Sequence, residues 1–344
     1  MGGAGCVRPV LSAAAIASAV VAGCAAPGSS FEADPAVVST ATGTALHSPV
    51  WSYREHALVA LTDDHRLVTV TDPEGSRRPV TRTSAPLGAG RDIEISELDD
   101  RHVFVPQPGA GRVAVVDLDG LRPVGALTAG PAPAYLAQDA GARLLLALSA
   151  DGTHVTAVNL HRRTALATAE VPGDAQSTID GANRGDVVEY HLYGPGEIGY
   201  YKGAGSPPPL RGTYAVTAEA AAGDGAKVTR TYVAGPGSRE LLAVDVQRGG
   251  DGLQVVGHAV LPAPIRFLGT DDTRIYAATD RGLVVLQSAS FTGYRNSTIP
   301  VIRTISLADR LGGAAVSGMA IGPHRVYLTV RGQDRVLGVA KPRL

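Results

Sequence analysis

A recurring segment of about 43 residues constrains the fold of this chain more than any other feature. Each copy has a charged or turn residue, an apolar strand, a turn containing Gly, Asp or Pro, and a second apolar strand. Six copies end at Asp72, Asp117, Asn159, Asp245, Gln287 and Ala340. The interval of 86 residues between Asn159 and Asp245 is twice the usual spacing, and a seventh copy, VVEYHLYGPGEIGYYK, ends within it at Lys202.

Seven equal units, each too small to bury its own apolar surface, are typical of blades arranged around an axis. Further β-type segments flank each hairpin, such as Ala134–Asp139 before the third copy and Ala165–Val171 after it. We therefore predict an all-β, seven-bladed β-propeller with four-stranded antiparallel blades over residues 36–344. The last copy ends too near the C-terminus for an outer strand, so we expect the N-terminal strand Val37–Thr42 to supply it and close the ring.

Two segments depart from the regular spacing. The segment Ala289–Pro300 reads as an insert and accounts for the longer last interval. The run Ser206-Pro207-Pro208-Pro209 stands where the fourth blade needs its outer strand. Because proline cannot donate a hydrogen bond to a β-ladder, an irregular loop is expected there.

The segment from Asp117 to Asn159 carries a Val-Asp strand end, a Val-x-x-Leu strand, a Gly-x-x-Pro step and another hairpin. In this order of elements it resembles the YVTN-repeat propellers. The resemblance is good over blades 2 and 3 and poor over blade 4, and the family's own motif is replaced, for example by Phe104-Val105-Pro106-Gln107. It implies the fold only, because that family includes surface proteins, lactonase-like enzymes and redox propellers.

The first 23 residues have the three parts of an export signal. Arg8 lies in a short start, Val10–Ala22 is apolar but too short to span a bilayer, and small residues follow. Val21-Ala22-Gly23-Cys24 resembles the bacterial lipobox, in which a peptidase cuts before a lipid-modified cysteine. The alternative is an ordinary signal peptide beside an accidental cysteine. With the repeats, this points to a propeller lipoprotein of actinobacterial type, attached through Cys24 to the extracytoplasmic face of the cell membrane.

Cysteine usage agrees with lipidation, because the only other cysteine is Cys6, inside the predicted signal. Residues 24–35 are rich in Ala, Ser, Gly and Pro and are expected to be a flexible tether. Basic and acidic residues number 31 and 32 with no basic stripe, so no nucleic-acid partner is expected. We expect a monomer that carries no cofactor, with the lipid bilayer and an unknown envelope protein or small ligand as partners.

Polar and aromatic residues on the predicted inner strands are the candidate ligand-binding residues, because these strands surround the central channel. Asp92, Glu94 and Ser96 alternate and should share one face of a strand. The corresponding positions in other blades add Trp51, Arg54, Tyr135, Glu219 and Arg266. The competing interpretation is that these side chains pair with one another or face solvent at the rim.

Three functions are compatible with these observations. The first is a non-catalytic binding or scaffold module, which needs nothing that the sequence lacks. The second is a lactonase-like or quinoprotein-like enzyme with its site in the channel, although the mature chain has no nucleophile elbow, P-loop or dinucleotide fingerprint. The third is zinc binding or delivery, although no two of the nine histidines stand at close metal-binding spacing. The polar residues that end the repeats are expected to cap turns.

Overall fold

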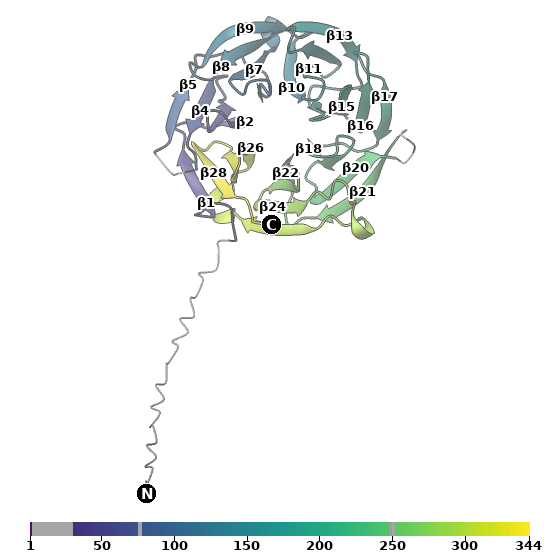
Figure 1. Cartoon of the computed structure of the whole chain (residues 1–344). Coiled ribbons are helices and arrows are strands. Elements are labelled where there is room, and N and C mark those ends of the chain that lie inside the picture. Colours follow the sequence, from purple (N-terminus) through teal and green to yellow (C-terminus); the bar gives the residue numbers. More distant parts are fainter. Residues whose placement is uncertain (2–29, 75–77, 248, 250–251) are drawn as a thin grey trace.

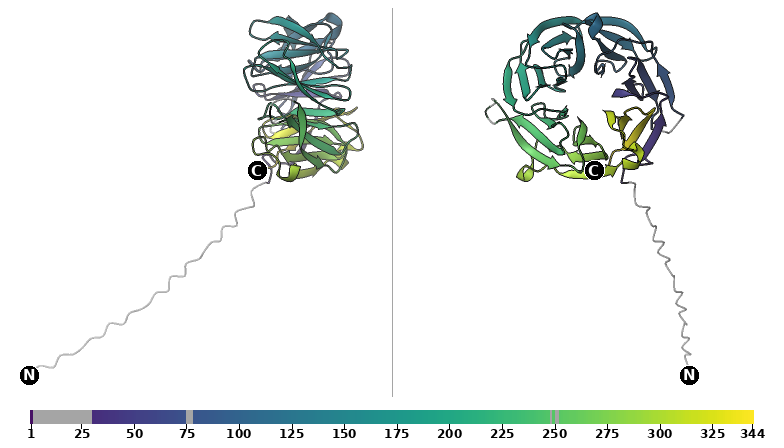
Figure 2. Two further views of the ribbon diagram at one scale, coloured as in Figure 1. Left: turned by 90° about the vertical axis from the view of Figure 1, so that its right-hand side faces the viewer. Right: turned by 180° about the vertical axis from the view of Figure 1, so that it is seen from behind.

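The computed structural model of the chain describes residues 1, 30–74, 78–247, 249 and 252–344. Seven four-stranded antiparallel sheets stand around a central axis, so the protein is a seven-bladed β-propeller, as the repeat predicts (Figure 1). Each blade runs from an inner strand beside the axis to an outer strand at the rim. The side view in Figure 2 shows that the ring is a thick disc.

The strands of the first four blades follow the chain from inside to outside. Blade 1 consists of β2 (His47–Ser52), β3 (Ala57–Leu61), β4 (Leu67–Thr71) and β5 (Val80–Thr83). Blade 2 consists of β6 (Glu94–Ile95), β7 (His102–Gln107), β8 (Arg112–Asp117) and β9 (Arg122–Thr128). Blade 3 consists of β10 (Pro133–Asp139), β11 (Leu144–Ser149), β12 (His154–Asn159) and β13 (Thr164–Glu170). Blade 4 consists of β14 (Thr178–Gly181), β15 (Val188–Tyr193), β16 (Ile198–Gly203) and β17 (Leu210–Tyr214).

The remaining blades complete the ring. Blade 5 consists of β18 (Ala220–Gly223), β19 (Thr231–Ala234), β20 (Glu240–Val246) and β21 (Leu253–Val260). Blade 6 consists of β22 (Ile265–Thr270), β23 (Arg274–Thr279), β24 (Gly282–Gln287) and β25 (Val301–Ser306). Blade 7 consists of β26 (Val316–Ile321), β27 (Arg325–Val330), β28 (Arg335–Ala340) and β1 (Val37–Ala41). The helical turns are η1 (Pro108–Ala110), η2 (Arg295–Ser297) and α1 (Ala308–Leu311).

The N-terminal strand closes the ring, as expected from the missing outer strand of the last repeat. β1 pairs antiparallel with β28 from Val37 opposite Val339 to Ala41 opposite Arg335. The first and last strands of the propeller therefore lie in one sheet, and their hydrogen bonds hold the two ends of the propeller together.

The core is divided among the seven interfaces between neighbouring blades. Seven clusters of buried apolar residues occur in the described part of the chain, and each joins two adjacent blades. Aliphatic side chains dominate them because the second and third strands of each blade are buried on both faces, as in the all-buried β11 (Leu144–Ser149). Each repeat thus buries its apolar surface only against its neighbours.

The fourth blade corrects one expectation from the sequence. Its outer strand β17 (Leu210–Tyr214) is regular enough to pair with β16, with Ile198 opposite Tyr214. The prolines at 207–209 lie in the turn before this strand, so none of them has to donate to the ladder. The expectation of an irregular loop in place of the outer strand of blade 4 is therefore wrong.

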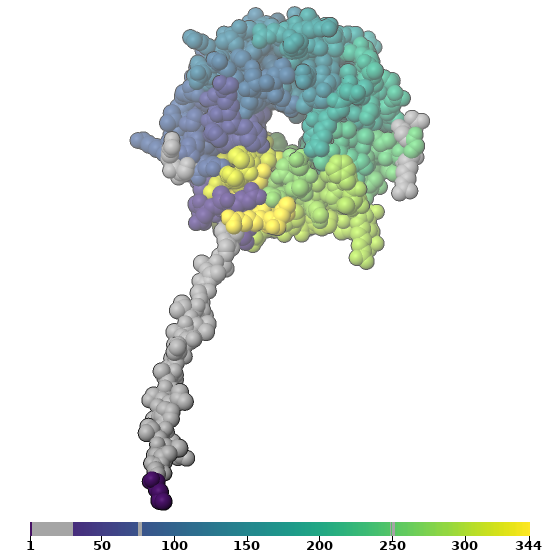
Figure 3. All heavy atoms as spheres, in the orientation of Figure 1, coloured from purple at the N-terminus to yellow at the C-terminus, as the bar shows by residue number. Residues whose placement is uncertain are grey.

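The two faces of the disc differ in a simple way. In every blade the inner strand is followed along the chain by the second and third strands, and neighbouring strands are antiparallel. The inner strands therefore all run in the same direction, and their C-terminal ends share one face. We call this the front face. It faces the viewer in Figure 3 and carries the C-terminal end of the chain beside an open channel.

The structure describes the predicted tether, residues 24–35, only from Ser30 onward. Cys24 and the predicted signal lie outside the described residues, apart from Met1. Ser30, Phe31 and Glu32 are held at the front face by the C-terminal segment: the Glu32 N–H donates to Lys341 O at 2.8 Å, and the Arg343 N–H donates to Ser30 O at 3.0 Å. The Arg303 guanidinium stacks over the Phe31 ring at 4.5 Å.

Candidate functional site

A cavity of about 360 Å³ lies in the central channel, between the inner strands of blades 2 to 6. We call it the channel cavity. Its polar lining includes Glu94, Tyr135, Asp180, His191, Tyr193 and Thr270. Two of the residues expected at a channel site, Glu94 and Tyr135, are therefore in its wall. The volume is in the range of small-molecule pockets.

Asp92 lies beside this cavity but has a structural partner. Both carboxylate oxygens accept from the backbone N–H of Leu136 at 3.0 Å, and the residue is buried. Burial raises the pKa of Asp92 well above its usual range, while the bond to Leu136 and the charge of Arg91 oppose this rise. Asp92 therefore joins blade 2 to blade 3.

Glu94 is a carboxylate of blade 2 that lines the cavity. The Gln138 side-chain amide donates to Glu94 Oε2 at 3.3 Å. Burial raises the pKa of Glu94 well above its usual range, and the negative charges of Asp92, Glu97 and Asp180 raise it further. Glu94 is consequently a carboxylate whose charge is poorly compensated by this protein.

Tyr135 lies between the carboxylates of blades 2 and 4. The Arg91 guanidinium sits 5.2 Å from the centre of its ring, and this guanidinium also donates to Ser177 O. Burial, followed by the charges of Asp92, Glu94 and Asp180, raises the pKa of the Tyr135 hydroxyl. Its hydroxyl therefore stays protonated and can donate a hydrogen bond.

Asp180 and His191 are cavity residues that the sequence analysis missed. Burial raises the pKa of Asp180 to about 6, against the opposing hydrogen bond from the Gly223 N–H. Burial lowers the pKa of His191 to about 4, so its ring is neutral near pH 7. A signal for Asp180 was present: it lies eight residues before Val188, the first residue of β15, as Glu94 lies eight residues before His102 in blade 2.

Trp51 and Arg54, the candidates from blade 1, are not in the wall of the channel cavity. Trp51 is 7% exposed and stacks on Tyr327 of blade 7, with ring centroids 4.9 Å apart. Arg54 lies in the turn after β2, where its backbone N–H donates to Asp100 at 2.6 Å and its side chain is 55% exposed. Neither side chain joins the others at a channel site.

Glu219 and Arg266 form an ion pair at the other end of the channel. The Arg266 guanidinium lies 2.8 Å from both the Glu219 and the Asp280 carboxylates. Both residues stand at the N-terminal ends of inner strands, on the face opposite the front face. Asp92, Glu94, Glu219 and Arg266 thus fall into two separate groups, so the convergence that an enzyme site needs is not found among these four.

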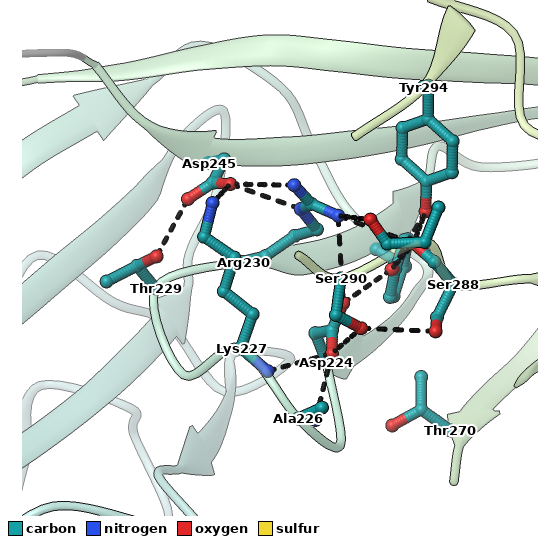
Figure 4. A network of polar contacts seen from close by, with 12 residues as sticks. Asp224, Ala226, Lys227, Thr229, Arg230, Asp245, Thr270, Ser288, Ser290 and Tyr294 are labelled. Carbon is teal, nitrogen blue, oxygen red and sulfur yellow. Dashed lines mark hydrogen bonds and ion pairs between the residues drawn. The ribbon is translucent and has the colours of Figure 1, made fainter. Parts of the chain in front are cut away.

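A buried polar network joins blades 5 and 6 (Figure 4). Arg230 lies 3.1 Å from Asp245, and Lys227 lies 2.6 Å from the same carboxylate. Arg230 also donates to the carbonyls of Ser288 and Ala289, at the start of the predicted insert. The network therefore fastens the insert to blade 5.

The residues that end the repeats behave in two ways. Asp117 and Asn159 accept from backbone N–H groups of the following turns, as expected for turn-capping residues. Asp245 differs, because its principal partners are the cations of the network described above. Its opposite-charge contacts overcome the effect of burial and lower its pKa.

No group of three or more His, Cys, Asp and Glu residues is arranged to hold a metal ion in the part of the chain that the structure describes. The same residues contain no helix with the length and apolar character of a membrane span. No described geometry favours the metal-delivery alternative.

The comparisons with known proteins agree with the architecture. No protein family profile matches the chain, and no curated protein sequence is similar to it. The solved structure of U3-55K is similar over 90% of this chain and 99% of its own, with a TM-score of 0.65 and 10% identity. That of the RRP9 WD40 repeats is similar over 90% and 98%, with a TM-score of 0.66 and 9% identity. At such low identity these similarities support the seven-bladed propeller fold alone.

Proposed function

We propose that this protein is a lipid-anchored binding module on the extracytoplasmic face of the cell membrane. The proposed anchoring is supported by the sequence Val21-Ala22-Gly23-Cys24, which follows a short apolar stretch. The proposed binding function is supported by the channel cavity, where polar side chains from several blades face a common space. No nucleophile or convergent acid–base pair among the predicted residues favours the enzyme alternative.

The way the N-terminal segment is held supports a definite orientation of the disc. Glu32 lies 2.9 Å from Arg274 at the front face, and Ser30 is hydrogen-bonded to the C-terminal segment. Six residue steps separate Cys24 from Ser30, which is at most about 20 Å of extended chain. A lipidated Cys24 then keeps the front face near the bilayer and turns the opposite face toward the surroundings.

The anchor is tested by the substitution Cys24→Ala. We expect the wild-type protein in the membrane fraction and in the detergent phase of a Triton X-114 separation, and the variant in the soluble phase, because the acyl chains are lost. Cys6→Ala is the matched control and should stay with the membrane. Membrane retention of Cys24→Ala to the same extent as wild type would remove the lipoprotein proposal.

The extracytoplasmic location has a separate test. Protease added to intact cells or spheroplasts should digest the propeller while a cytoplasmic control protein survives. Protection of the propeller until the membrane is lysed contradicts the proposed location.

A further inference from the structure

The charge of the channel cavity is unbalanced. Its lining contains four carboxylates, those of Glu94, Glu97, Asp180 and Asp224, and neither lysine nor arginine among the described residues. Asp224 is occupied by Tyr232 and Ser290. Arg91 is already engaged with Ser177 O and the Tyr135 ring, and Arg230, which lies 3.9 Å from Asp224, is paired with Asp245. The cavity therefore lacks positive charge of its own.

Three lining carboxylates have spare hydrogen-bonding capacity, and of these Glu94 and Asp180 are partly buried whereas Glu97 is exposed. In each of the two partly buried residues, one oxygen accepts a single hydrogen bond, from Gln138 and from the Gly223 N–H respectively. No described residue donates to Glu94 Oε1 or to Asp180 Oδ1. The two residues come from blades 2 and 4, and they are close enough that the charge of Asp180 raises the pKa of Glu94.

A second observation points to a ligand with hydrogen-bond donors. His191 lines the same cavity and is 3% exposed, and its Nε2 atom has no hydrogen-bond partner among the described residues. The ring is stacked on Tyr200 and Tyr193, with centroid distances of 5.0 and 6.4 Å. A neutral ring has one nitrogen with a proton and one without, and the ring is hydrogen-bonded to the Thr229 backbone, which takes the proton-bearing nitrogen and leaves Nε2 as the acceptor. Buried polar atoms normally have partners, so an unsatisfied acceptor in a cavity wall needs an explanation.

These features together favour one class of ligand. The free groups are acceptors, two of them carboxylates, and they are spread over several blades. A metal ion requires at least three ligating groups at one point, and no such group occurs among the described residues. A neutral sugar could accept and donate hydrogen bonds but would leave both carboxylates uncompensated. An ammonium group brings positive charge and three N–H donors.

We propose that the channel cavity binds a small aliphatic amine with two or more ammonium groups, held between Glu94 and Asp180. Each carboxylate accepts from one ammonium group, and the neutral His191 ring and the Tyr135 hydroxyl offer further hydrogen-bond contacts. The cavity volume of about 360 Å³ suits a short, unbranched molecule. This inference rests on the proposed function, since it names the ligand of the same binding module.

The test is calorimetric titration of the purified full chain with putrescine and with spermidine. We expect one molecule bound per chain. Glu94→Gln and Asp180→Asn should each weaken binding by about tenfold or more, because each removes one charged contact. Glu170→Gln, which removes an exposed carboxylate from the outer strand β13, should change the affinity by less than about twofold. Melting temperatures of the variants show that each is folded.

Three results overturn the proposal. One is the absence of amine binding at millimolar concentration. Another is equal binding by wild type and both channel variants, which indicates general attraction to a negative surface. The third is tighter binding of Ca²⁺ or glucose at the same residues. Failure of the amine test leaves membrane attachment through Cys24 untouched, and failure of the Cys24→Ala test leaves amine binding untouched, so the two proposals fail separately.

Discussion

Trp51 and Tyr327 stack face to face, with their ring planes 3° apart, at the interface between the first and last blades. Trp51 comes from the inner strand of blade 1 and Tyr327 from the second strand of blade 7. Their contact lies in the apolar cluster that also contains Leu58 and Val336. The only tryptophan of the chain therefore belongs to the packing that closes the ring.

The first prediction concerns this stack. Trp51→Ala should lower the free energy of unfolding by about 3–5 kcal/mol, because it leaves a cavity in the interface that closes the ring. Trp51→Phe should cost clearly less, since an aromatic ring is kept and the Trp51 Nε1 atom has no hydrogen-bond partner to lose. Urea denaturation followed by far-ultraviolet circular dichroism measures both. Equal midpoints for wild type and Trp51→Ala contradict a structural role for the stack.

The second prediction concerns the closing strand. Deletion of residues 1–43 removes β1 and leaves β28 as an unpaired edge, so we expect a lower melting temperature and concentration-dependent oligomers. Deletion of residues 1–29 is the control and should leave a monomer with nearly the wild-type melting temperature. Light scattering after size-exclusion chromatography separates the two results. A monomeric, equally stable protein without β1 is the contrary outcome.

The third prediction concerns the buried network. Arg230→Ala should cost about 3 kcal/mol of stability, because Asp245 loses one of its two cations while remaining buried. The Ser288 and Ala289 carbonyls lose their donor, so trypsin should cut faster at Arg295 in the insert. Arg66→Ala removes an exposed pair with Asp64 and should cost less than about 1 kcal/mol. Unchanged proteolysis and stability in Arg230→Ala contradict this account.

The fold could be predicted from the sequence because one property repeats. Each copy must hide its apolar strands against its neighbours, so seven copies specify a ring without any knowledge of individual contacts. The repeat ends at Asp117, Asn159, Gln287 and Ala340 coincide with the ends of third strands. The prediction failed at the outer strand of blade 4. The prolines at 207–209 indicated a break in the strand, but the sequence did not show that they lie before β17 and leave it intact.

The candidate site was predicted only in part, and β-bulges explain much of the difference. Alternation along a strand assigns side chains to faces only while the register is unbroken. Register shifts occur in β2 between His47 and Val50 and in β22 between Ile265 and Phe267. Arg266 is the extra residue of the second shift, so it does not occupy the position equivalent to the blade 2 residues from which it was predicted.

The alternation succeeded in placing Glu94 in the channel wall, and Tyr135 lies there too although a register shift directly precedes it. His191 could not be found in this way, because it lies on the second strand β15 and not on an inner strand. Position within a repeat therefore predicts which strand faces the axis, but not which residues of neighbouring strands reach it.

The fourth prediction is a dependence of stability on pH that belongs to Asp180. The charged or titratable groups that face it are Glu94 from β6, Tyr135 from β10 and Tyr193 from β15, and the Gly223 N–H of β18 donates to it. Burial raises its pKa from 3.8 to about 6, so between these values the folded protein holds a proton that the unfolded chain has released. The free energy of unfolding therefore falls as pH rises through this interval.

Asp180→Asn removes this pH dependence of the free energy of unfolding, because asparagine stays neutral and its side-chain oxygen still accepts from the Gly223 N–H. The variant should match wild type near pH 4 and exceed it by up to about 3 kcal/mol at pH 7.5, since two pKa units correspond to roughly that free energy. Denaturant titrations at both pH values give the difference directly, with Glu170→Gln as the control for loss of an exposed charge. A stability difference that is the same at pH 4 and pH 7.5 shows that ionisation of Asp180 is not its cause. A ligand that supplies positive charge to the channel cavity should offset the same penalty, so saturating spermidine is expected to narrow the gap at pH 7.5 by stabilising wild type more than the variant.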